Sequence, residues 1–151
     1  MKLFLLAAFL LSILPGSKAQ HVKKMENNKK DSTAISMALE DYYFKGIYEG
    51  NLDLLKQVYN TGTLLFGDVK GQPYAKNLDQ YFDGVKNRQS PKDSGKPFHG
   101  EIIAINVVNS IAVAEVMVTM YDFHYHEFLS WHQLNGQWVI VNKMITDLDS
   151  K

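Results

Sequence analysis

The part of the chain after Pro97 constrains the fold most, because its apolar residues recur there with a period of two. Four strand candidates follow one another almost without interruption: FHGEIIAINVV, IAVAEVMVTMY, FHYHEFLSWHQL and QWVIVNKMITDL. Short links join them at Asn109-Ser110, Asp122 and Asn135-Gly136, and Asn-Gly is a strong signal for a two-residue hairpin turn. This part of the chain therefore predicts an antiparallel meander.

Before the meander the apolar period is that of a helix. An amphipathic helix is predicted over residues 33–49 by apolar residues at helical spacing: Ile35, Leu39, Tyr42, Tyr43 and Ile47. Asn51 and Asn77 are each suited to cap the start of a further helix, and the run TLLFGDVKG between these two helices predicts a short strand. Helices followed by an antiparallel meander define an α+β fold, with three N-terminal helices packed on one face of a curved sheet.

The first nineteen residues have the pattern of a secretory signal peptide. Lys2 supplies a positive charge, LFLLAAFLLSIL an apolar segment, and Ser17 and Ala19 the small residues before a cleavage site after Ala19. The alternative is an uncleaved membrane anchor, but the twelve apolar residues are fewer than the roughly 20 that a spanning helix needs. We therefore expect an exported protein, secreted or periplasmic, that leaves the membrane after cleavage.

The remainder of the chain is long enough for one domain. Residues 20–31 are polar and carry no periodic apolar pattern, so we expect a flexible leader there and a single domain over residues 32–151. Removing residues 1–19 leaves 14 basic and 16 acidic residues without a basic stripe, which argues against nucleic acid as a partner. The chain has no cysteine, which excludes disulfides, thiolate metal sites and a cysteine nucleophile.

Three strings in this order resemble the putative lumazine-binding family of the nuclear transport factor two-like superfamily: DYYFKGIYEGNLDLLKQV, LLFGDVKGQPYAKNLDQYFDGV and NGQWVIVNKM. The resemblance covers roughly residues 33–148. It implies a cone-shaped α+β fold whose helices and concave sheet enclose a pocket, often in a homodimer. It implies little about chemistry, because this fold serves enzymes, binding modules and scaffolds alike.

The stretch YDFHYHEFLSWHQ raises the question of a metal site. Alternate strand residues share a face, so His124, His126 and His132 lie together, and Tyr125 and Glu127 lie on the opposite face. His124 and His126 would be about 6–7 Å apart, but His132 would lie roughly 20–26 Å from them. No HExxH-like signature is present. We therefore expect no metal and no cofactor, and regard the histidines as solvent-facing strand residues.

If simple hairpins without bulges join the strands, paired residues on neighbouring strands share a face of the sheet. The two faces of this strand can then be extended across the other strands. The face opposite the histidines is the more apolar, so it is predicted to be the inner one; a β-bulge would reverse every later side chain. The predicted inner set includes Ile103, Ile105, Val107, Ala112, Ala114, Val116, Val118, Met120, Trp138, Ile140, Asn142 and Met144. The predicted outer set is also apolar and would support a homodimer formed sheet to sheet: Ile102, Val113, Met117, Phe128, Val139, Val141 and Ile145, with Lys143 at its rim.

A pocket on the inner face would be lined by polar and aromatic side chains. The predicted ligand-binding residues are Tyr42, Phe66, Tyr74, Tyr81, Glu101, Tyr125, Glu127 and Asn142. Among these, Glu101 and Glu127, together with His99, are the candidates for acid/base catalysis, because a carboxyl group enclosed by apolar side chains is desolvated. The alternative is that each is an ordinary buried polar group with a partner, and that the tyrosines belong to the core.

Three functions remain open on the sequence. The first is an exported, non-catalytic domain that binds a small, flat, partly apolar molecule. The second is a cofactor-free enzyme of the isomerase, dehydratase or cyclase type, with a carboxylate base and a tyrosine donor. The third is a dimeric interaction scaffold. The first two require a real cavity, and the third predicts a filled one.

Overall fold

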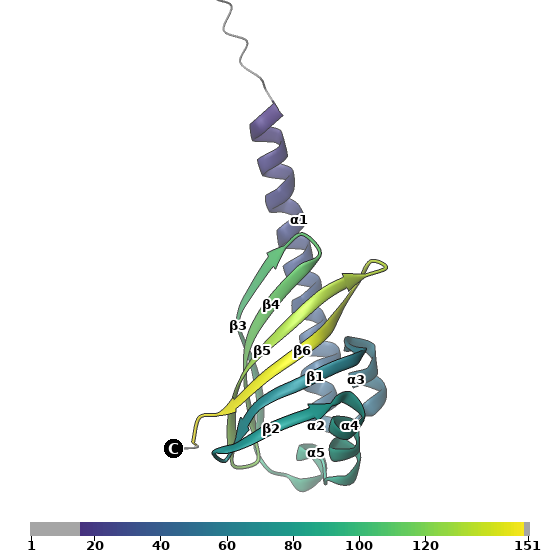
Figure 1. Cartoon of the computed structure of the whole chain (residues 1–151), viewed down its shortest axis with the longest axis vertical. Helices are drawn as coiled ribbons and strands as arrows, with labels where there is room; N and C mark the ends of the chain where they lie inside the picture. Colours follow the sequence, from purple (N-terminus) through teal and green to yellow (C-terminus); the bar gives the residue numbers. More distant parts are fainter. Residues whose placement is uncertain (1–15, 150–151) are drawn as a thin grey trace, which may run out of the picture.

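The computed structural model describes residues 16–149, so residues 1–15 of the predicted signal peptide lie outside the described part (Figure 1). The helical elements are α1 (Gly16–Ala38), the π-helical turn η1 (Leu39–Phe44), α2 (Lys45–Glu49), α3 (Leu52–Val58), α4 (Leu78–Asn87) and α5 (Pro91–Ser94). The strands are β1 (Tyr59–Val69), β2 (Gln72–Asn77), β3 (Phe98–Val108), β4 (Ile111–Met120), β5 (Phe123–Leu134) and β6 (Gln137–Asp147). The predicted α+β class is confirmed.

The first helix extends beyond the body of the domain. Residues 20–31, the predicted leader, are part of α1, whose N-terminal half projects past the sheet in Figure 1. Asp31 of α1 is bonded to the sheet: its carboxylate accepts hydrogen bonds from the Trp138 indole at 3.2 Å and from Gln133 at 3.4 Å. Among residues 16–149 no helix is long and apolar enough to cross a membrane.

The six strands form one curved sheet in the order β2-β1-β6-β5-β4-β3. The meander from β3 to β6 has the predicted strands and antiparallel pairing, and β1 pairs parallel to β6. A turn at Lys70 and Gly71, both with positive φ, joins β1 to β2, which the sequence analysis did not predict as a strand. The helices cover one face of the sheet, so the sheet has a buried face and an open one (Figure 1).

Two β-bulges change which residues face the helices. One lies between Ile102 and Ala104 in β3, and the other lies in β6 opposite the Ser130–Trp131 step of β5. Since a strand has a period of two, one extra residue reverses the facing on one side of the bulge. The predicted facing was therefore wrong in two segments.

In β3, the residues before the bulge are reversed. His99 and Glu101 are exposed on the open face, and Ile103 is 47% exposed, whereas Ile102 packs against the core. The prediction holds after the bulge, where Ile105 and Val107 pack against the core.

In β6, the residues after the bulge are reversed. Lys143 and Ile145 are buried on the inner face, although both were predicted to be outer residues. Asn142 instead donates a hydrogen bond to the Leu64 carbonyl at 3.1 Å, and Met144 is 52% exposed. The bulge in β6 thus brings an amino group into the interior.

The core lies between the helices and the concave face of the sheet. Its fully buried members come from both layers: Ile35, Leu39, Leu55 and Val58 from helices, and Val116, Leu129, Trp131 and Ile140 from strands. Gly100 allows η1 to approach β3 closely, because a Cβ at this position would lie 2.5 Å from the Phe44 ring. A larger residue at position 100 would therefore push η1 away from β3.

Candidate functional site

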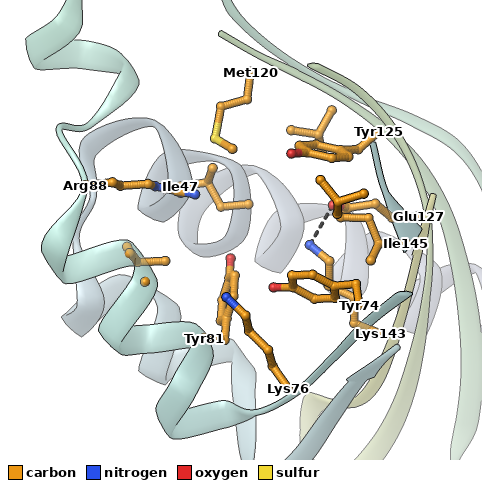
Figure 2. A pocket seen from close by; sticks show the side chains of 14 residues that line it. Ile47, Tyr74, Lys76, Tyr81, Arg88, Met120, Tyr125, Glu127, Lys143 and Ile145 are labelled. Atoms are coloured by element: carbon orange, nitrogen blue, oxygen red, sulfur yellow. Dashed lines mark ion pairs between the residues drawn. The ribbon is translucent and has the colours of Figure 1, made fainter. Parts of the chain in front are cut away.

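A cavity of about 190 Å³ lies between α4, α2 and the concave face of the sheet (Figure 2). Its lining combines apolar, phenolic and charged side chains: Ile47, Val69, Tyr74, Lys76, Tyr81, Gly84, Val85, Arg88, Val118, Met120, Tyr125, Glu127, Lys143 and Ile145. The cavity is smaller than the roughly 300–1,000 Å³ typical of sites for drug-sized ligands. It is therefore suited to a small molecule.

A network of three buried polar groups lies at one wall, to which Glu127 and Lys143 belong, while Tyr43 lies behind them and is not among the lining residues. Lys143 lies 2.6 Å from Glu127 Oε1, and their side chains are only 4% and 1% exposed. The Tyr43 hydroxyl donates to Glu127 Oε2 at 2.5 Å and accepts from the Lys143 ammonium at 2.7 Å. Each of the three groups is thus a hydrogen-bond or ion-pair partner of the other two, as buried charges require. Three elements supply it: η1, β5 and the segment of β6 after the bulge.

Burial dominates the electrostatics of this network. Desolvation raises the pKa of Tyr43 well above its usual value, and the Glu127 carboxylate raises it further. Desolvation lowers the pKa of Lys143, and the attraction of Glu127 opposes that shift. Tyr43 therefore remains a protonated donor, and the Lys143 ammonium depends on Glu127 for its charge.

Further tyrosines surround the network. Tyr59 contacts both Tyr43 and Tyr81, with ring centroids 6.1 and 5.6 Å apart. Burial raises the pKa of Tyr59, Tyr74, Tyr81 and Tyr125. These phenols therefore stay protonated at neutral pH. Figure 2 shows the hydroxyls of Tyr74, Tyr81 and Tyr125 directed into the cavity.

Two further cations border the cavity. Arg88 follows the last residue of α4, and its guanidinium points into the cavity from the side opposite Lys143 (Figure 2). The Lys76 ammonium lies 5.0 Å from the centroid of the Tyr74 ring. The cavity thus has cations on more than one wall.

The structure brings together half of the predicted ligand-binding residues. Tyr74, Tyr81, Tyr125 and Glu127 all line the cavity. The other four lie elsewhere and point away from it: Tyr42 is 39% exposed, Phe66 is 46% exposed, and Glu101 and Asn142 lie on the open face of the sheet. Glu101 and His99 share no site with Glu127, because the bulge in β3 directs them to solvent.

Sequence reasoning missed four polar residues of the site. Tyr43 was predicted only as one of the apolar residues of a helix, and Lys143 was placed on the outer face. Arg88 was given no role, because a basic residue at the end of a helix is ordinary. Lys76 was not considered. The i,i+4 series of Ile35, Leu39 and Tyr43 was the available signal that Tyr43, and not Tyr42, faces inward.

The histidines of β5 lie on the open face, as predicted. His126 contacts Glu115 at 2.8 Å and His124 contacts Asp149 at 2.5 Å, so each has an acidic partner. Within residues 16–149 no group of three histidine, aspartate or glutamate side chains is placed to hold a metal ion.

The fold is that of NTF2-like proteins. A protein of this class from Shewanella baltica OS155 superimposes with a TM-score of 0.69 at 21% identity, over 80% of this chain and 96% of that one. Another NTF2-like protein, from Silicibacter pomeroyi DSS-3, superimposes with a TM-score of 0.68 at 17% identity, over 87% of this chain and 98% of that one. Within this class the chain belongs to the putative lumazine-binding family, whose model matches residues 30–146.

One characterised relative is similar in sequence. The aldolase FrzH of a Cladobotryum species is 24% identical over 126 residues, which cover 83% of this chain and 94% of that enzyme. The family and the fold are therefore shown, and the chemistry of the cavity must be argued from its own residues.

Proposed function

We propose that this chain is an exported domain that binds a small molecule in the cavity between α4 and the sheet and does not transform it. The observation that carries the proposal is that donors from separate elements converge on one cavity of about 190 Å³. A protein that used this fold only as a scaffold would be expected to fill that space with apolar side chains. The aromatic rings of Tyr74, Tyr81 and Tyr125 suit a flat, partly apolar ligand.

The arrangement of Glu127 favours binding over catalysis. Its two oxygens already accept short hydrogen bonds from Lys143 and Tyr43, at 2.6 and 2.5 Å. A general base must present an oxygen to the substrate proton at a similar distance. The carboxylate is instead committed to holding Lys143 and Tyr43 in place, as a rigid wall of a binding site would require.

Export and dimer formation are part of the proposal. Export is supported by the pattern of residues 1–19. A homodimer through the open face of the sheet is supported by the exposure of large apolar residues there: Leu64, Phe66, Val113, Phe128 and Met144. Sedimentation of the purified chain should give twice the chain mass, and Phe128→Asp should give the single-chain mass.

A ligand screen with a cavity-blocking variant tests the binding function. Gly84 lines the cavity from α4, and a Cβ there would meet only the Lys76 ammonium, at 3.8 Å. Gly84→Leu should therefore reduce the cavity without disturbing the core, and Gly84→Ala is its matched control. Compounds from a metabolite library that raise the melting temperature of the wild type and of Gly84→Ala should have no effect on Gly84→Leu. The function is wrong if no compound in the library stabilises the wild type.

A second candidate is an enzyme that moves a proton next to a carbonyl group. Lys143 and Tyr43 are placed as acid/base groups beside the cavity, and the similar protein from Cladobotryum is an aldolase. Burial lowers the pKa of Lys143 against the attraction of Glu127, and a lysine with a lowered pKa gives up its proton more readily to act as an amine on a carbonyl compound.

Deuterium exchange distinguishes the two functions. The chain would be incubated with acetone, pyruvate or cyclohexanone in D₂O, and exchange next to the carbonyl followed by NMR. The enzyme predicts exchange that is lost in Lys143→Met and in Glu127→Gln. The binding function predicts no exchange beyond that of a protein-free control.

A further inference from the structure

The guanidinium of Arg88 is the polar group of the cavity that the protein leaves unsatisfied. Its Nε and Nη2 atoms are buried, and neither has a hydrogen-bond partner within residues 16–149. Leaving a buried N–H group without an acceptor is unfavourable, and more so when the group is charged. Native proteins therefore pair such groups, either internally or with what they bind.

The two unsatisfied atoms have a particular geometry. Nε and Nη2 lie on the same edge of the planar guanidinium, so their N–H bonds run nearly parallel. Such a fork matches the two oxygens of a carboxylate, which it binds through two parallel hydrogen bonds. The edge that the protein leaves unpaired is therefore the one suited to a carboxylate.

The charges of the cavity wall point to the same class of ligand. Three cations line it, Lys76, Arg88 and Lys143, against the single carboxylate of Glu127, which leaves an excess of two positive charges. Glu127 is already paired with Lys143, so it does not neutralise Arg88. Asp147 is also buried but is not among the residues that line the cavity, and none of the ion pairs in residues 16–149 includes Arg88.

The influence of Arg88 extends across the cavity. Burial raises the pKa of Tyr74, Tyr81 and Tyr125, and the positive charge of Arg88 opposes that rise. Burial lowers the pKa of Lys143 on the opposite wall, and the charge of Arg88 adds a smaller lowering. Because burial keeps Tyr81 protonated, its hydroxyl can donate a hydrogen bond to an anion that Arg88 holds. The side of the cavity that faces Glu127 remains available for the rest of the molecule.

From this geometry we propose that the ligand is a small organic carboxylate, bound through two hydrogen bonds from Arg88 Nε and Nη2 and oriented with its apolar part toward Tyr74 and Tyr125. This assignment rests on the proposed binding function and specifies its ligand class. The Lys76 ammonium and the Tyr81 hydroxyl complete the set of donors around the carboxylate. The ion pair of Glu127 and Lys143 lies at the far side and keeps that wall fixed.

Matched acids and amides test the proposal. Acetate, benzoate and cinnamate would be compared with acetamide, benzamide and cinnamamide by calorimetry at pH 7, together with inorganic phosphate. We expect at least one acid to bind at least about tenfold more tightly than its amide, since hydrogen bonds between charged groups are the strong ones. Arg88→Met should abolish that preference. Arg88→Lys, which keeps the charge but not the fork, should retain only part of it.

Lys86→Met is the control for long-range charge, because Lys86 lies on the exposed side of the same helix. It should leave the preference unchanged. Equal binding of acids and amides, or an unchanged preference in Arg88→Met, would overturn the carboxylate assignment. So would phosphate binding more tightly than every acid.

The result also separates this inference from the binding function. If amides or other neutral compounds bind and Gly84→Leu blocks them, the cavity is a ligand site and only the carboxylate assignment fails. If neither acids nor neutral compounds bind, both fail. Arg88→Met is expected to fold, with a melting temperature no lower than that of the ligand-free wild type, because it removes unpaired buried N–H groups.

Discussion

Replacing Lys143 by methionine should destabilise the domain strongly, although methionine fits the space. The lysine stem passes over the rings of Tyr43 and Tyr81, with its ammonium 5.3 and 5.6 Å from their centroids, and methionine can reproduce much of that packing. What the variant removes is the charge that balances Glu127, whose side chain is only 1% exposed. The loss therefore reports on the buried ion pair and not on a void.

The expected cost is about 3–5 kcal/mol, the range for leaving one partner of a buried pair uncompensated. A domain of this size gains roughly 3 °C in melting temperature for each kcal/mol, so the variant should melt roughly 9–15 °C lower. The exposed pair of Lys56 and Asp53, 3.8 Å apart with side chains 57% and 93% exposed, provides the control. Lys56→Met should cost less than about 1 kcal/mol.

A double-mutant cycle in urea checks the reasoning. Glu127→Gln together with Lys143→Met removes both charges and leaves an amide oxygen that can accept from Tyr43, so the double variant should be more stable than Lys143→Met alone. Two results would refute the account of the pair. One is a loss below 1 kcal/mol in Lys143→Met, and the other is a double variant whose loss equals the sum of the two single losses.

Three further predictions concern the tyrosines, the helix α4 and Arg88. Burial raises the folded-state pKa of Tyr43 and Tyr59, so their contribution to stability is complete below about pH 10 and is lost above it, by up to about 1.4 kcal/mol per pH unit for each. Because the folded-state pKa of Lys143 is lowered, deprotonation of this lysine makes the domain more stable as the pH rises, but only below about pH 10.5. Urea unfolding between pH 8 and 11.5, with phenolate absorbance at 295 nm, should show the loss, and a flat profile above pH 10 would contradict it. Gly84→Ala should raise the free energy of unfolding by up to about 1 kcal/mol, because glycine is unfavourable inside a helix; a measured decrease would mean that this position tolerates no Cβ. Arg88→Met should unfold in urea at no lower concentration than the ligand-free wild type, and a loss above 1 kcal/mol would show that the guanidinium is already satisfied.

The periodic parts of the fold could be predicted from the sequence. The meander and its turns follow from a period of two with Asn-Gly between the last two strands, and Tyr125 and Glu127 were placed inside because β5 has no bulge before them. Tyr81, which the sequence placed at the pocket, is likewise buried on the inward side of its helix. Where the period is uninterrupted, the apolar residues mark the buried face of a strand or helix, so the sequence predicts which side chains point inward.

The rest of the site depends on interruptions of the period. One extra residue in β6 turns Lys143 inward and Asn142 outward, and no residue type in VIVNKM marks that position as a bulge. One extra residue in β3 turns Glu101 to solvent. Arg88 could not be distinguished from an ordinary charge at the end of a helix. Its distinctive feature is that two buried N–H groups have no acceptor nearby in the described part of the chain, which only the packed structure shows.

Native mass spectrometry tests most directly whether the cavity is a ligand site. The chain would be purified without denaturation from the cells that produce it, and its mass measured in native and in denaturing solvent. The account predicts an additional small mass that is lost on denaturation, present also in Gly84→Ala and absent from Gly84→Leu. Identical native and denatured masses for the wild type, together with no stabilising compound in the library screen, would contradict it.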